Sequence, residues 1–116
     1  MKLAVEEIGN VQASMMVVRI DASRIDAAAA IQFKDAMRDI AEDGTGLVLL
    51  DLSEVEFIDS SGLGAIVAVM KFLAPLRRLE LAGLQPNVAR VFRLTRMDSV
   101  FAIHPEVETA MASHAG

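Results

Sequence analysis

An apolar strand, a polar turn and an apolar helix follow one another in the middle of this chain, and they decide its fold. The strand reads Leu47-Val48-Leu49-Leu50-Asp51-Leu52, and the turn reads Asp59-Ser60-Ser61-Gly62-Leu63-Gly64. A short apolar run that follows a glycine turn is typical of a fully buried strand. Helical spacing continues beyond the turn, at Leu63, Ile66, Val67, Met70 and Leu73. This unit therefore predicts a central strand that leads into a packed helix.

Upstream of this unit, the patterns predict two strands and a helix. The expected strands are a weak one over Leu3–Ile8 and a second over Val11–Ile20, joined by a turn at Gly9-Asn10. The expected helix is capped by Asp26, runs to about Glu42 and ends before Gly44. The helix is indicated by an apolar stripe that includes Phe33 and Met37. Ile31 falls off that stripe and is expected to be exposed.

Downstream, two further strands alternate with two helices. Pro75 is expected to end the central helix, followed by a strand over Arg78–Gly83, a helix from Pro86, a strand over Val100–Ile103 and a helix from Pro105. The order β-β-α-β-α-β-α-β-α predicts an α/β fold. We expect one domain over residues 1–116, with a mixed sheet of about four to five strands and about four helices packed on it.

Composition narrows the class of protein. The 116 residues are 53% hydrophobic and 23% charged, which favours one well-filled core over disorder. The absence of cysteine and of a visible signal peptide fits a reducing compartment, so we expect a cytoplasmic protein. The longest apolar stretch, Leu63–Leu76, is too short to cross a bilayer. A net charge of −5 without Trp or Tyr argues against nucleic-acid binding.

The sequence lacks the residue patterns that are typical of enzyme active sites. A nucleophile elbow needs a glycine two residues before and two residues after its serine, and neither Ser60 nor Ser61 has that pair. The chain has only two histidines, His104 and His114. Both are expected at the surface, and His114 lies in a tail expected to fray. A metal cluster would need carboxylate partners that the sequence does not single out, so we expect no catalytic residue, cofactor or metal.

The serine turn has two interpretations. Asp or Ser before an apolar helix is a common N-cap, which needs no further function. The turn also follows the expected central strand, where sites of open α/β sheets collect. A phosphate on Ser60 or Ser61 would meet the positive end of the helix dipole. Gly62 and Gly64 weaken the first turn, which suggests that something approaches the backbone closely.

The turn and its flanks resemble a known family. Residues 59–64, preceded by Val55-Glu56-Phe57-Ile58 and followed by Ala65-Ile66-Val67, look like the phosphorylation-loop signature of the STAS-domain anti-sigma factor antagonists. The stretch Ser23–Ala27 resembles the turn and aspartate before the family's first helix, and residues 88–101 resemble its late helix and last strand. The likeness spans nearly the whole chain. Ser23 departs from the family, which often has glycine there.

The resemblance implies a protein that switches partners. The unmodified form would bind an anti-sigma factor serine kinase, which carries the ATP and Mg²⁺, and would thereby free a sigma factor. Phosphorylation of Ser60 would switch binding off, and a PP2C-type phosphatase would restore it. The expected partner-binding residues are Asp26, Asp59, Ser61, Gly62 and Leu63, although Leu63 is equally plausible as a core anchor. The alternative is a constitutive STAS adaptor in a larger regulatory or transport assembly, in which the serines only cap the helix.

Overall fold

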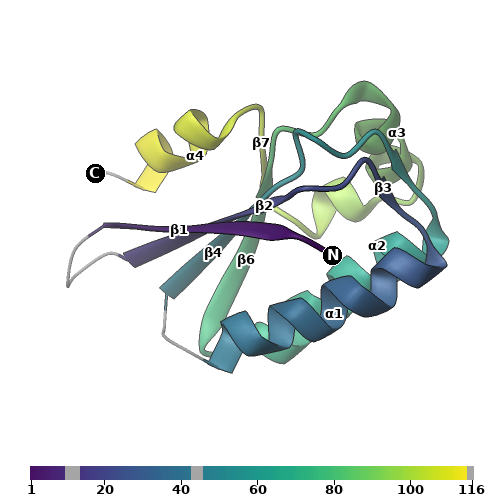
Figure 1. Ribbon diagram of the computed structural model, residues 1–116. Helices are drawn as coiled ribbons and strands as arrows, with labels where there is room; N and C mark the ends of the chain where they lie inside the picture. The colour runs from purple at the N-terminus through teal and green to yellow at the C-terminus, as the bar shows by residue number, and fades with distance from the viewer. Residues whose placement is uncertain (10–13, 43–45, 115–116) are drawn as a thin grey trace.

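A five-stranded mixed sheet runs through the molecule in the order β1-β2-β4-β6-β7 (Figure 1). The structure is a computed structural model that describes residues 1–9, 14–42 and 46–114. The strands are β1 (Leu3–Gly9), β2 (Ser14–Ile20), β4 (Gly46–Asp51), β6 (Arg77–Ala82) and β7 (Ile103–His104). β1 and β2 are antiparallel, and the remaining pairs are parallel. The apolar run at residues 47–52 thus supplies the central strand, as predicted.

Helices cover both faces of the sheet (Figure 1). α1 (Ala27–Glu42) and α2 (Ser60–Leu73) pack side by side on one face, and α4 (Val107–His114) lies on the other. α3 (Pro86–Leu94) adds Val88 and Phe92 to the core beneath α1 and α2. A smaller apolar cluster lies under α4, formed by Met15, Val17, Leu49, Ala82 and Ala110. The expectation of four helices on a mixed sheet is confirmed.

A second sheet of two short strands was not predicted. β3 (Arg24–Ile25) and β5 (Phe57–Ile58) pair in parallel, with Ile25 aligned with Ile58. Two residues are too few to show an alternating pattern, so periodicity has no means of finding such strands. They are nevertheless important, because they connect the large sheet to the starts of α1 and α2.

Several predicted boundaries need correction. The last strand is Ile103–His104 rather than Val100–Ile103, because Val100 ends the 3-10 turn η1 (Met97–Ser99) and is 48% exposed. The final helix starts at Val107, two residues after Pro105. The expected turn residue Asn10, residues 11–13 and the helix stop at Gly44 lie outside the described residues. Ile31 is exposed, as predicted. Within the described ranges, no helix combines the length and the apolar character needed to cross a membrane.

Candidate functional site

The starts of α1 and α2 lie next to each other because β3 and β5 are in parallel register. Ile25 and Ile58 are aligned, so the residues that follow them, Asp26 and Asp59, occupy equivalent positions. The backbone N–H of Asp59 also donates to the carbonyl of Ile25 at 3.4 Å. The two loops therefore converge, and two helix N-termini lie at the same edge of the molecule.

Each of these aspartates caps its own helix. The Asp59 carboxylate accepts a hydrogen bond from the backbone N–H of Gly62 at 2.9 Å, and its own backbone is extended, as in a standard N-cap. The Asp26 carboxylate accepts from the N–H of Ala29 at 3.1 Å. The capping interpretation of the turn is thus correct for Asp59. Neither serine makes that bond, which leaves the serines open to another role.

Ser60 and Ser61 are exposed at the first two positions of α2. Among the described residues, no hydrogen bond engages either hydroxyl. A hydroxyl that the fold does not use is available to a modifying enzyme. The geometry offers both serines in this way, and only the resemblance to the family signature selects Ser60.

Gly62 and Gly64 have different roles. A Cβ on Gly62 would overlap the carbonyl oxygen of Ile25 and would stand 2.8 Å from the Ile58 side chain. The close approach inferred from the glycines is therefore made by the neighbouring strand. A Cβ on Gly64 would meet nothing within 4 Å. Leu63 is 9% exposed and belongs to the main core, so its packing favours the core-anchor interpretation over direct partner contact.

An exposed aromatic residue lies beside the serines. Phe57 is 40% exposed, and the guanidinium carbon of Arg24 lies 4.3 Å from its ring centroid. The carbonyl of Ser23 accepts hydrogen bonds from the N–H groups of Glu56 and Phe57, at 2.8 and 3.1 Å. Ser23 therefore holds this loop against β5 even though it replaces a glycine. We call the exposed side chains of Arg24, Phe57, Ser60 and Ser61 the Ser60 surface.

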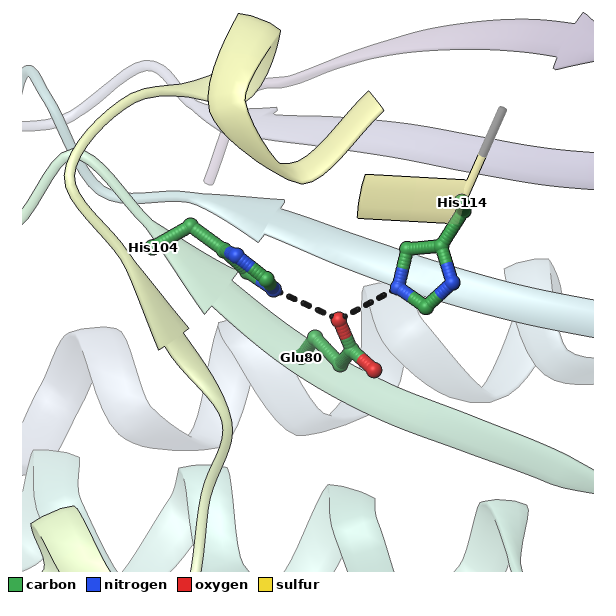
Figure 2. Close-up of side chains that lie close together, drawn as sticks. All are labelled: Glu80, His104 and His114. Carbon is green, nitrogen blue, oxygen red and sulfur yellow. Dashed lines mark hydrogen bonds and ion pairs between the residues drawn. The ribbon is translucent and has the colours of Figure 1, made fainter. Parts of the chain in front are cut away.

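A second polar cluster lies on the opposite face of the sheet, under α4 (Figure 2). Glu80 is 1% exposed, and its Oε1 accepts from the Nε2–H groups of His104 at 2.7 Å and His114 at 2.9 Å. Burial by itself raises the pKa of Glu80, but the bonds to His114 and His104 and the nearby Arg78 outweigh it, so the pKa is lowered. The expectation of a surface position holds for His114, whose side chain is 37% exposed, but not for His104, whose side chain is only 16% exposed.

Sequence reasoning missed this cluster. Polarity alternates along residues 78–83, which places Glu80 on the opposite face of the strand from Leu79 and Leu81, and that face is the one α4 covers. One signal was present: Val107, Ala110, Met111 and His114 recur at helical spacing, and the first three pack against the sheet. His114 continues that stripe, so a helix packed by this stripe brings its imidazole toward the strands. Glu80 supplies the carboxylate partner that the sequence did not single out.

Comparison with known proteins agrees with the fold. An anti-sigma-B factor antagonist of Listeria monocytogenes is 36% identical over 84 residues, which are 71% of this chain and 73% of the relative. A solved anti-sigma factor antagonist of Mycobacterium paratuberculosis superposes with a TM-score of 0.78 at 23% identity, covering 99% of this chain and 96% of the other. The phosphorylated form of the Bacillus cell fate determinant SpoIIAA superposes with a TM-score of 0.64 at 21% identity, covering 95% and 98%.

A family model describes nearly all of the chain. The STAS domain model matches residues 2–110, which include β3, β5, the serine turn and the first half of α4. The resemblance first noted at residues 59–64 thus extends through the fold as a whole. The chain belongs to the STAS domain family.

Proposed function

We propose that this protein is an anti-sigma factor antagonist that acts in the cytoplasm and is switched by phosphorylation of Ser60. The unmodified form binds an anti-sigma factor with serine kinase activity, and a sigma factor is released. The kinase transfers phosphate from its own ATP to Ser60, and a PP2C-type phosphatase removes it. The observation that carries the proposal is an exposed, unengaged serine beside two capping carboxylates, in a chain whose Listeria relative is named as such an antagonist.

Docking is supported by the chemistry of the Ser60 surface. Phe57 offers an exposed aromatic ring, held by Arg24, within three residues of Ser60. Aromatic and arginine side chains are enriched among the residues that dominate binding energy at interfaces. The backbone beneath them is held by β3–β5 pairing and by the bonds of Ser23. A partner therefore meets a surface that is already ordered.

The charge at this edge explains how phosphate would end binding. Phosphorylation adds about −1.5 to −2 charges, next to the Asp59 carboxylate and near that of Asp26. A close interface formed around an unmodified hydroxyl is not arranged to pair this group with a positive charge, and the guanidinium of Arg24 lies over the Phe57 ring. Burying an unpaired charge there costs about 2–5 kcal/mol of binding energy, or about 30-fold to several thousand-fold in affinity.

The fold itself should tolerate the phosphate. Ser60 is the first residue of α2, where the free N–H groups and the helix dipole favour negative charge. The core contacts of α2 come from buried side chains further along the helix, namely Leu63, Ala65, Ile66, Val69 and Leu73. The switch therefore acts on binding and leaves the folded state in place. SpoIIAA, with the same fold, has a solved phosphorylated form.

The test is capture from a lysate of the source organism, with and without ATP, followed by phosphosite mapping. We expect the unmodified chain to retain a protein with a serine kinase domain, and ATP to release it with one phosphate added at Ser60. Ser60→Ala should keep the partner in the presence of ATP. Ser61→Ala is the matched comparison for the modified residue, because it removes the neighbouring exposed hydroxyl and should still leave some phosphate transfer, whereas Ser60→Ala should leave none.

Two results would contradict the proposal. Phosphate found on Ser61 with Ser60 unmodified would overturn the assignment of the residue. A partner that binds equally before and after modification, or a transporter or scaffold captured with no phosphate transfer, would instead indicate the constitutive adaptor.

A further inference from the structure

Both histidines of the chain converge on one carboxylate oxygen (Figure 2). The Nε2 atoms of His104 and His114 lie 2.7 and 2.9 Å from Oε1 of Glu80, and the three atoms all lie within 4.8 Å of one another. We propose that Glu80, His104 and His114 form a binding site for a divalent transition metal ion, with Zn²⁺ as the best match. We call these three residues the Glu80 site. The proposal does not rest on the proposed function.

Three separate elements bring the ligands together. Glu80 and Ala82 point to the same face of β6, and Ala82 is aligned with His104 on the neighbouring β7. His114 comes four residues after the buried Ala110 on α4, so both face the sheet. Figure 2 shows the two rings approaching the carboxylate from opposite sides. The site therefore depends on α4 being docked.

The donor set selects the class of ion. Two imidazole nitrogens and one carboxylate oxygen suit Zn²⁺ and its neighbours Co²⁺, Ni²⁺ and Cu²⁺, whereas Mg²⁺ and Ca²⁺ prefer oxygen ligands alone. Three protein ligands leave the fourth tetrahedral position to water. Arg78 Nε donates to the second carboxylate oxygen, Oε2, at 3.1 Å. That bond orients the carboxylate and leaves Oε1 as a single ligand atom.

The metal-free geometry is close to what coordination requires. Zn²⁺ at about 2.0–2.1 Å from each ligand separates tetrahedral ligand atoms by about 3.3 Å, so each nitrogen must move away from Oε1 by about half an ångström. The two nitrogens, which lie within 4.8 Å of each other, must also settle at about that separation. His114 can do so, since it ends α4 and its side chain is 37% exposed. A metal-bound imidazole needs a free lone pair on Nε2, so metal binding removes the proton from Nε2 and leaves the ring proton on Nδ1.

Burial separates this cluster from an ordinary exposed one. The Glu80 side chain is 2% exposed and that of His104 is 16% exposed, so these two ligands are already removed from bulk water. A fold that keeps a charged carboxylate there must compensate its lost hydration. The imidazoles do this by hydrogen bonding when no metal is bound, and a divalent ion would do so more strongly. A bound ion would thus link α4 to β6 and β7.

The test is metal titration of the full chain, without an affinity tag, after removal of metal by a chelator. We expect about one equivalent of Zn²⁺ by calorimetry, visible absorption of bound Co²⁺ typical of four-coordination, and a rise in Tm with Zn²⁺. His114→Gln and Glu80→Gln should each weaken binding at least about 10-fold, since even the partners behind ligands change affinity that much. Glu108→Gln removes an exposed carboxylate of the same helix and should bind like the parent.

A readout on the unmodified chain keeps the test independent of variant folding. Zinc should shift the Nε2 nitrogen resonances of both histidines, and Nδ1 should carry the ring proton in the zinc-bound form. The proposal is overturned if Zn²⁺ and Co²⁺ show no saturable binding, if Glu108→Gln loses as much affinity as His114→Gln, or if Mg²⁺ binds as tightly as Zn²⁺. Unshifted histidine nitrogens in the presence of bound Zn²⁺ would also overturn it.

Discussion

Carboxylates serve opposite purposes on the two sides of this sheet. At the Ser60 surface, Asp26 and Asp59 remain partly exposed and bond to backbone groups three residues ahead. Under α4, Glu80 is almost fully buried, and its histidine partners are 24 and 34 residues away in sequence. The first arrangement leaves charge available at an edge where a partner can dock. In the second arrangement the carboxylate is paired inside the fold, and its bonds to the two histidines connect β6 with β7 and α4.

The largest expected effect is on partner binding at the Ser60 surface. Phosphate on Ser60 should weaken binding of the captured kinase by about 2–5 kcal/mol. Ser60→Asp should weaken binding less, because it adds only one negative charge. Calorimetry or surface plasmon resonance with the purified partner measures both. Thr109→Asp places the same charge on exposed α4 and should leave affinity unchanged; an equal loss there would mean that binding responds to net charge alone.

The next effect is on the packing beneath the serines. Gly62→Ala should destabilise the fold by about 1–3 kcal/mol, because its Cβ would overlap a backbone oxygen of β3 that cannot rotate away. Gly64→Ala, two residues on in the same helix, should stabilise it by about 0.5–1 kcal/mol, as it meets nothing. Urea denaturation of both variants measures the two changes in the free energy of unfolding. Equal effects would show that helix propensity, not the contact with Ile25, governs this turn.

The capping aspartates should each contribute about 1 kcal/mol. Asp59→Ala and Asp26→Ala both remove a bond to a helix N–H, and such caps cost about this much. The two carboxylates lie at neighbouring helix starts, so each single variant loses a cap but gains relief from repulsion, and the double variant, which gains that relief only once, should lose more than the sum. Asp59→Asn keeps the acceptor and should lose least. Strict additivity in denaturation experiments would mean that the caps do not interact.

The smallest expected effect is the change of folding stability with pH that Glu80 causes in chelator-treated protein. Because the pKa of Glu80 is lowered in the folded state, the folded protein holds this proton less tightly than the unfolded chain. Its contribution to stability is therefore present above the ordinary carboxyl range and is lost as the pH falls through and below it. Arg78, His104 and His114 are the charged or titratable groups found against it within the described ranges.

Denaturation between pH 6 and pH 3 measures this contribution. The parent protein should lose stability more steeply than Glu80→Gln, which has no proton to gain. Glu108→Gln, changed at an exposed position, should follow the parent. Identical slopes for the parent and Glu80→Gln would show that the buried carboxylate is not held ionised by its histidines.

Much of the Ser60 side of the molecule was predictable from sequence, because its signals are local. The central strand, the helix that follows and the cap at Asp59 all depend on residues within one or two turns of each other. The single-domain mixed sheet followed from the order of such signals and is confirmed. What local patterns missed there are β3 and β5, whose two-residue pairing exists only because distant loops meet.

The Glu80 side depended on tertiary packing. The alternation of polarity in β6 correctly places Leu79 and Leu81 on one face of the sheet and Glu80 on the other. It does not show which element covers the face that carries Glu80. α4 covers it, through a small apolar cluster that includes Ala110, and this makes an apparently solvated glutamate a buried one. By itself the sequence determined the strand–turn–helix unit and the exposed serines, since short-range hydrogen bonding and periodicity specify them. Only the tertiary structure decided that both histidines reach Glu80, because contacts between residues far apart in the chain depend on how whole elements pack.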